Sequence, residues 1–164
     1  MDKTQNDEAS HREIENLLID YCRYLDRMEL GNLASLFTKD CRVIYGPDPK
    51  LAAEGQVALE SSLARMWRWQ RTAHHLSNVR IWFDGPDQAR SESYVNAWHE
   101  MPNGKTGTIF GRYLDQLRRT ENGWRIAERR MDMNGADPGF RVPVPQAPRR
   151  TPPAGWAPPE GLDD

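Results

Sequence analysis

The second half of the chain contains four long strand-like segments separated by short turn sequences. The segments span 72–83, 89–101, 106–119 and 123–134, and the sequences between them include "DGPDQ", "PNGK" and "TENG". Turns rich in Gly, Pro, Asn and Asp join neighbouring antiparallel strands as hairpins. Long strands joined in this way predict an antiparallel sheet with a strong twist.

The first half of the chain is mainly helical by its hydrophobic periodicity. Apolar residues recur at helical spacing over 11–28, which predicts an amphipathic helix. Ser10 is the expected N-cap of this helix, and Glu13 completes a capping box. Three further elements are predicted in order: a short helix in "NLASLF", a short strand in "CRVIYG" and a helix over 56–69.

Helices followed by an antiparallel meander predict an α+β fold. We expect a cone-shaped barrel, in which a strongly curved antiparallel sheet is closed by the N-terminal helices around a cavity. Residues 1–135 are assigned to this domain and 136–164 to a proline-rich C-terminal tail. Within the tail, we expect the segment around 138–146 to pack along the sheet or over the mouth of the cone. A hollow interior in a small domain usually holds a ligand.

Composition excludes several classes of protein. A chain of 164 residues with a formal net charge of −2 suits one domain and has no general attraction to nucleic acid or to an anionic membrane. Cys22 and Cys41 have neither disulfide-framework nor metal-site spacing, and no phosphate loop, dinucleotide turn or HExxH motif occurs. No signal-like or membrane-spanning run is present. We therefore expect a cytoplasmic protein that acts on a small molecule without a metal or cofactor.

Two adjacent histidines, His74 and His75, lie near the start of the first long strand, in "RTAHHLSN". Neighbouring strand residues point to opposite faces of a sheet, so one imidazole is expected to point into the protein and the other away from it. The alternation does not decide between them. Apolar residues with the parity of each histidine occur further along the same strand.

Three stretches of the sequence resemble the SnoaL-like family of the nuclear-transport-factor-like superfamily: "YCRYLDRMELGNLASLFTKDC", "RTAHHLSNVRI" and "GRYLDQLRRTENGWRIAERR". Scytalone dehydratase and hexachlorocyclohexane dehydrochlorinase, to which the residues are similar, are cofactor-free lyases with a His–Asp dyad. The resemblance places this dyad on His74 and Asp26, and it matches Tyr45 to a tyrosine that orients water. A second tyrosine of the dehydratase is replaced here by Leu25, so that part of its machinery is missing or supplied by another residue.

The proposed dyad also has a physical basis. Asp26 lies at the edge of the apolar stripe of the first helix, where a partly buried carboxylate needs a partner. An imidazole bonded to that carboxylate has a fixed tautomer, and its other ring nitrogen is left free as a general base. The alternative is that Asp26 caps the helix or faces water and that His74 is an ordinary packed strand residue.

Five more residues are candidates for substrate binding: His99, Arg112, Arg129, Trp67 and Trp98. The resemblance suggests a pocket role for His99 and for the two arginines. A buried arginine binds an anionic or carbonyl oxygen and must itself be paired. The two tryptophans, together with Trp69, are suited to walls around a flat substrate. Ordinary strand positions, surface ion pairs and core packing are the respective alternatives.

Two classes of function follow. The first is a cofactor-independent lyase of the dehydratase, dehydrohalogenase or retro-aldol type, or an isomerase, and its expected substrate is a small aromatic molecule. The second is a non-catalytic protein, either a small-ligand binder or a small subunit that resembles the β subunit of aromatic-ring dioxygenases. In either class we expect a homodimer or homotrimer, because one helical layer does not cover all the apolar strand residues, among them Val79, Ile81, Phe83, Val95 and Ala97.

Overall fold

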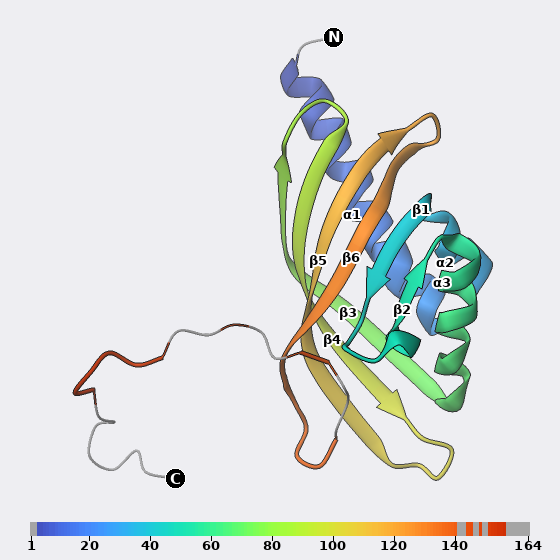
Figure 1. Cartoon of the computed structure of the whole chain (residues 1–164), viewed down its shortest axis with the longest axis vertical. Coiled ribbons are helices and arrows are strands. Elements are labelled where there is room, and N and C mark those ends of the chain that lie inside the picture. Colours follow the sequence, from blue (N-terminus) through green and yellow to red (C-terminus); the bar gives the residue numbers. More distant parts are fainter. Residues whose placement is uncertain (1–2, 141–143, 146–147, 149–150, 157–164) are drawn as a thin grey trace.

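In the computed structural model, the described residues are 3–140, 144, 145, 148 and 151–156. A long helix, α1 (Lys3–Asp26), runs along one face of a twisted six-stranded sheet (Figure 1). Two short helices, α2 (Leu30–Ser35) and α3 (Gln56–Leu63), contact each other beside one edge of that sheet. The predicted α+β class, with a strongly curved sheet and an N-terminal helix across it, is confirmed.

The sheet is mixed and open, which corrects the expected antiparallel barrel. Its strands are β1 (Phe37–Ile44), β2 (Ala52–Glu54), β3 (Arg71–Phe83), β4 (Gln88–Glu100), β5 (Thr106–Thr120) and β6 (Gly123–Ala136). They are ordered β2-β1-β6-β5-β4-β3, and β1 runs parallel to β6 while all other neighbours are antiparallel. The three hairpins were predictable from local turn sequences. The β1–β6 pairing joins segments far apart in the chain, for which no local sequence signal exists.

The start of α1 also differs from the expectation. The helix begins at Lys3, so Ser10 and Glu13 lie inside it and form no capping box. Instead, the Ser10 hydroxyl accepts a hydrogen bond from Arg119 at 2.6 Å, and a Glu13 carboxylate oxygen accepts one from the backbone N–H of Trp124 at 2.8 Å. Both side chains therefore attach the helix to the β5–β6 hairpin.

A bulge in β3 explains why strand alternation alone was undecided. The register with β4 shifts between Ser77 and Arg80, and Asn78 has a positive φ of 50°. Asn is one of the few residues that adopt this conformation readily. The extra residue reverses the alternation, so that even-numbered positions before the bulge and odd-numbered positions after it face the same side of the sheet. His74 therefore shares the inner face with Val79 and Ile81, and His75 is exposed.

The bulge also shows that the reason given for expecting an oligomer, uncovered apolar residues on the strands, was wrong. Val79, Ile81 and Phe83 pack against the core, and Val95 and Ala97 are buried within it, so none of the five needs a second copy to cover it. On the outer side of the sheet, Trp82 and Phe110 are exposed. The oligomeric state itself remains a prediction.

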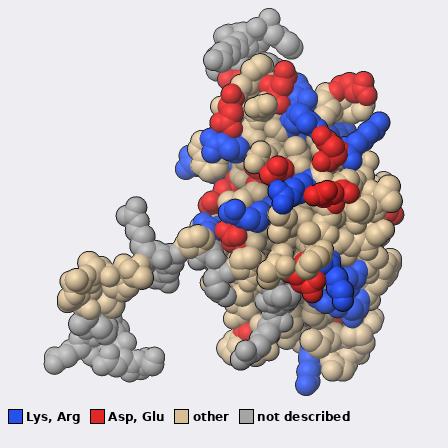
Figure 2. Space-filling model, viewed as in Figure 1, with Lys and Arg blue, Asp and Glu red and all other residues tan. Residues whose placement is uncertain are grey.

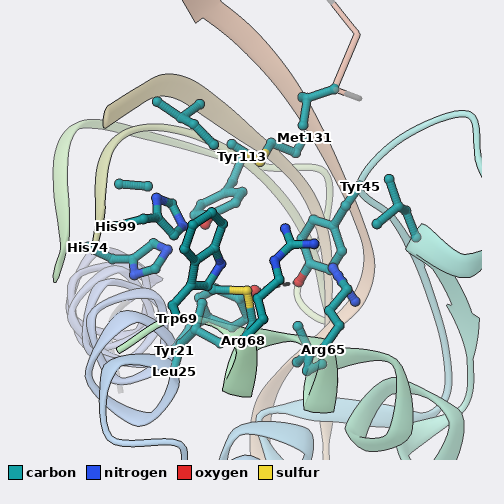
Figure 3. A pocket seen from close by; sticks show the side chains of 16 residues that line it. Tyr21, Leu25, Tyr45, Arg65, Arg68, Trp69, His74, His99, Tyr113 and Met131 are labelled. Atoms are coloured by element: carbon teal, nitrogen blue, oxygen red, sulfur yellow. Dashed lines mark hydrogen bonds between the residues drawn. The ribbon is translucent and has the colours of Figure 1, made fainter. Parts of the chain in front are cut away.

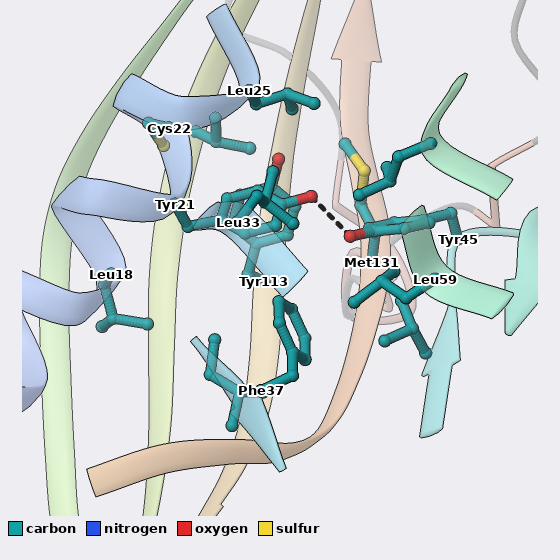
Figure 4. Packing of buried hydrophobic residues seen from close by; sticks show 14 of the residues in the cluster. Leu18, Tyr21, Cys22, Leu25, Leu33, Phe37, Tyr45, Leu59, Tyr113 and Met131 are labelled. Atoms are coloured by element: carbon teal, nitrogen blue, oxygen red, sulfur yellow. Dashed lines mark hydrogen bonds between the residues drawn. The ribbon is translucent and has the colours of Figure 1, made fainter. Parts of the chain in front are cut away.

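The core lies between α1 and the inner face of the sheet (Figure 4). Leu18 and Tyr21 from the helix meet Phe37 and Tyr113 from the strands, and each of these four side chains is buried. Burying side chains of this size contributes roughly 1.5–3 kcal/mol each before conformational entropy is counted. This packing holds α1 against β1 and β5, and hydrogen bonds from Thr72 and His74 hold Asp26, at the end of the helix, against β3.

Charged side chains of both signs are interspersed on the face drawn in Figure 2. Several form exposed cross-strand or loop pairs, such as Arg90 with Asp84 and Arg118 with Asp40. Among the described residues, no helix combines the length and the apolar character needed to span a membrane.

Candidate active site

A pocket lies in the core near the C-terminal end of α1 and holds about 640 Å³ of space, including its open mouth. Its walls are mainly aromatic and apolar, and its polar groups come from histidines, tyrosines and arginines (Figure 3). Lining residues come from α1, from β3, β4, β5 and β6, and from η2 (Ala64–Arg68), a single 3-10 turn that follows α3. Segments distant in sequence therefore converge on one cavity.

Asp26 and His74 form a close pair at this pocket. The Nδ1 atom of His74 lies 2.6 Å from Oδ1 of Asp26, and the side chain of His74 is only 4% exposed. The same carboxylate accepts the backbone N–H of His74 at 2.9 Å and the hydroxyl of Thr72 at 2.8 Å. The predicted contact between the two residues is therefore present. Since Nδ1 is engaged, Nε2 is the ring nitrogen left for the pocket that His74 lines.

The electrostatics of Asp26 favour its ionised form. Partial burial alone would raise its pKa, but the hydrogen bonds and charge of His74, with the Thr72 hydroxyl, hold the pKa below its usual value. A carboxylate that stays ionised accepts a hydrogen bond from Nδ1–H and stabilises the positive charge that forms when Nε2 takes up a proton.

His99 is the second imidazole of the pocket. Its ring centre lies 5.6 Å from that of His74, in an edge-to-face arrangement. Burial, and after it the charge of the nearby His74, lower the pKa of His99 to about 4. His99 is therefore neutral at neutral pH. Its Nδ1 atom is buried and has no hydrogen-bond partner among the described residues, so this polar atom is available to a ligand.

Tyr21 and Tyr45 meet inside the pocket and share a hydrogen bond between their hydroxyl groups (Figure 4). Burial is the main reason that the pKa of each phenol is raised, and the pKa of Tyr113 beside them is raised by burial as well. These hydroxyls therefore keep their protons and serve as hydrogen-bond donors. Tyr45 was expected at the site. Tyr21 supplies a second phenol there, although Leu25 occupies the position where the resemblance placed one.

The two strand arginines do not line this pocket. Arg129 is fully buried, where Nε and Nη2 donate to Asp115 at 2.7 and 2.8 Å. Its guanidinium carbon lies 4.1 Å from the ring centre of Tyr21 and 4.2 Å from that of Tyr113, so it supports two pocket walls from behind. Arg112 lies near Glu92 and Asp132, outside the lining.

Two of the three tryptophans considered as pocket walls are also outside the lining of the pocket. Trp67 is 67% exposed, and Trp98 is half-buried on β4. Trp69, the third of them, does line the cavity, and its ring centre lies 4.8 Å from that of His99. Residues 64–68 form a 3-10 turn, whereas the sequence was interpreted as regular helix to residue 69, and this changes which aromatic side chain points inward.

Part of the C-terminal segment covers the pocket. The ring of Phe140 lies 5.7 Å from both Trp69 and His99, and Val144 lines the cavity. The backbone of Met133 donates a hydrogen bond to Pro145 at 2.6 Å. Phe140, Val144 and Pro145 thus follow the expectation for the segment around 138–146, while its residues 141–143 and 146 lie outside the described residues. Trp156 is exposed.

Several lining residues were not singled out from the sequence as site residues. Tyr21 and Tyr113 follow core periodicity, so their pattern is that of packing residues. Arg65 and Arg68 lie in a segment that was interpreted as an ordinary amphipathic helix. Their spacing of three residues was the one available signal that both point the same way. Within the described part of the chain, His, Cys, Asp and Glu side chains form no group of three suited to a metal ion.

The sequence and the fold were compared with known proteins. A family model described as a SnoaL-like domain matches residues 8–130. No curated protein matches the sequence. A candidate scytalone dehydratase from Novosphingobium aromaticivorans is similar in structure, with a TM-score of 0.83 and 27% identity, over 90% of this chain and 99% of that chain.

Two further solved structures share the fold. The type 3 hexachlorocyclohexane dehydrochlorinase from Novosphingobium barchaimii LL02 has a TM-score of 0.74 and 20% identity, over 87% of this chain and all of the other (100%). A candidate aromatic ring hydroxylase from Novosphingobium aromaticivorans has a TM-score of 0.70 and 24% identity, over 76% of this chain and 89% of that chain. At these identities the likeness concerns the fold alone.

Proposed function

Because the chain belongs to the SnoaL-like domain family, we propose that it is a cofactor-independent lyase in which His74 is the general base and Asp26 orients it. The observation that carries the proposal is the 2.6 Å contact between Nδ1 of His74 and Oδ1 of Asp26, which leaves Nε2 at the pocket. The candidate scytalone dehydratase, whose name denotes water loss, supports elimination as the class of reaction.

The proposed reaction begins at a C–H bond of the substrate, on the carbon next to a carbonyl group, where the hydrogen is acidic. Nε2 of His74 takes the proton from that carbon, and the released electron pair forms a new carbon–carbon double bond as a hydroxyl or halide leaves the adjacent carbon. The ionised Asp26 stabilises the imidazolium that results. A positioned base of this kind typically accelerates proton transfer by about 10²–10⁴-fold.

Other lining residues stabilise the substrate in this scheme. Tyr45 and Tyr21 keep their protons, so either hydroxyl can donate to the carbonyl oxygen as negative charge develops on it. A leaving hydroxyl departs as water after it takes a proton from the imidazolium. The aromatic walls formed by Tyr21, Trp69 and Tyr113 suit a flat substrate, aromatic or polyketide-like.

Proton abstraction can be tested before the natural substrate is known. We would incubate the protein in D₂O with scytalone, hexachlorocyclohexane and a panel of fused-ring β-hydroxy ketones. Mass spectrometry then measures deuterium incorporation and loss of water or of hydrogen chloride. Wild-type protein should catalyse exchange or elimination on at least one compound, and His74→Gln should lose about 10²–10⁴-fold of that rate.

His75→Gln is the matched control, because it changes the same side chain one residue away on the exposed face of β3. It should retain the wild-type rate. An active protein in which His74→Gln and His75→Gln are equally fast would refute the dyad. Absence of any exchange across the panel, together with tight binding of its members, would instead favour the ligand-binding function.

A further inference from the structure

Two arginines of the pocket are not used by the elimination scheme. Arg65 and Arg68 both come from η2 and extend into the cavity (Figure 3). In that view they lie on the side away from His74 and His99, with the side chains of Tyr21 and Trp69 between the two groups. The pocket therefore has a basic side that faces its histidine side.

Neither arginine is paired with a carboxylate among the described residues. Arg65 donates through Nη1 to the backbone oxygen and, at 2.7 Å, to the hydroxyl of Ser62, which are neutral acceptors. The guanidinium of Arg68 stacks over the ring of Trp69, at 4.8 Å from its centre, and forms no described hydrogen bond. Most of their remaining N–H donors are thus available to a ligand.

Several other arginines of the described chain are paired with carboxylates, although exposed ones such as Arg80 are not. Arg71 is bonded to Glu100, Arg90 to Asp84 and Arg129 to Asp115. In contrast, the residues that line the pocket include no Asp and no Glu. Partial burial and the nearby charge of Arg65 both lower the pKa of Arg68, a residue that also reaches solvent, as expected for two cations that share a site without a counter-ion. An anionic ligand would relieve this repulsion.

We propose that Arg65 and Arg68 form an anion subsite, so that the substrate is a flat molecule that bears a carboxylate on the side opposite the carbon deprotonated by His74. The planar guanidinium fork matches a carboxylate in shape and donates two parallel hydrogen bonds to it. The inference rests on the proposed function only for which end of the ligand faces His74. The anion subsite itself is a matter of binding and can be tested without catalysis.

A pair of isosteric ligands provides the test. Dissociation constants of 2-naphthoate and 2-naphthamide, which differ in charge and little in shape, are measured by isothermal titration calorimetry at low and high salt. Wild-type protein should prefer the carboxylate by about 10-fold or more, since hydrogen bonds to charged groups are stronger than neutral ones. Higher salt should weaken that preference.

Substitutions then show which residues cause the preference for the carboxylate. Arg65→Gln and Arg68→Gln should each weaken naphthoate about 10-fold and leave naphthamide nearly unchanged. Arg65→Lys should recover part of the loss, because the charge is restored without the fork. Arg80→Gln is the matched control for lost charge, since Arg80 is exposed on β3 and outside the pocket lining, and it should change neither constant. Melting curves confirm that each variant is folded.

The outcomes separate the two proposals. Equal affinity for naphthoate and naphthamide in the wild-type protein, or a preference that survives both arginine substitutions, would overturn the anion subsite. His74→Gln should keep the preference for the carboxylate. A protein that prefers naphthoate through Arg65 and Arg68 but shows no His74-dependent exchange would retain the subsite and refute the proposed lyase.

Discussion

The core contains two pairs of a carboxylate with a cation or imidazole, and their surroundings differ. Asp115 and Arg129 are joined by two hydrogen bonds, and both side chains are fully buried. Asp26 and His74 are joined at a similar distance, but Asp26 is 25% exposed and His74 lines a pocket. Neither side chain of the first pair is exposed to solvent. The second leaves one ring nitrogen for a ligand, and this access distinguishes a candidate catalytic pair from a structural one.

The difference arises because arginine and histidine differ in whether they can lose their proton, and therefore in whether they need a permanent counter-ion. A buried arginine cannot lose its proton, so it needs a permanent counter-ion, and Arg129 has one in Asp115. An imidazole can be neutral and still bond to a carboxylate, so His74 can gain a proton and release it again. The two rings of Tyr21 and Tyr113 connect the pairs, because they stack on Arg129 and also line the pocket.

The largest effect on stability should come from breaking the structural pair. Asp115→Ala leaves the guanidinium of Arg129 buried without a counter-ion, which should lower the free energy of unfolding by about 3–5 kcal/mol. Urea denaturation measures the loss. The double substitution of Asp115→Leu with Arg129→Met is the control, and it should cost much less because no buried charge remains. A loss below about 1 kcal/mol for Asp115→Ala would remove the contrast between the pairs.

A smaller effect on stability should appear with pH at the pocket that His99 lines. The pKa of His99 is about 4 in the folded protein, below its ordinary value of 6.5, so the unfolded chain binds its proton first as the pH falls. The free energy of unfolding should therefore decrease between pH 6.5 and 4, by up to about 3 kcal/mol. The lowered pKa of Asp26 affects the free energy of unfolding only at lower pH, below the ordinary aspartate pKa of 3.8.

His99→Gln tests this assignment, because glutamine does not titrate. Unfolding by urea at several pH values should show a flatter dependence for the variant than for the wild-type protein over pH 6.5 to 4. If the two curves are parallel in that range, the buried neutral imidazole is not the cause of the acid sensitivity.

The smallest predicted effect concerns the cover of the pocket. Phe140 packs against Trp69 and His99, so Phe140→Ala should lower stability by about 1 kcal/mol and expose the histidine pair, while Asp115 and Arg129 remain buried. Gly107→Ala should act similarly, since an added Cβ would lie 2.2 Å from the Phe140 ring. Gly135→Ala, where a Cβ meets nothing within 4 Å, is the matched control. Thermal melts with equal midpoints for all three would argue against a packed cover.

The fold was predictable to the extent that its signals are local. The periodicity of α1 and the turn sequences of the three hairpins gave the helix and the long strands, with errors of a few residues at most boundaries. The bulge at Asn78 was not predictable, because the sequence does not show where a strand gains an extra residue. The three-residue strand β2 and the parallel β1–β6 pairing depend on contacts between distant segments.

The candidate site was predictable only through resemblance. Asp26 and His74 were placed together because similar sequences carry a dyad at these positions. Their spacing in the sequence alone was equally consistent with two ordinary residues. Arg129 was expected in the cavity because of the same resemblance, but Asp115 from the neighbouring strand satisfies it internally. The two arginines that do reach the cavity come from a 3-10 turn whose side-chain directions differ from those of the expected helix.

The most direct test of the central claim is nitrogen NMR of the His74 ring, which needs no substrate. With ¹⁵N-labelled histidine, assigned by comparison with His74→Gln, and at a pH where the ring is neutral, Nδ1 should carry the proton and Nε2 should be unprotonated. Asp26→Asn should abolish this preference and leave a mixture of tautomers. A wild-type ring that is protonated at Nε2 instead would contradict the account, because His74 would then have no free base directed at the pocket.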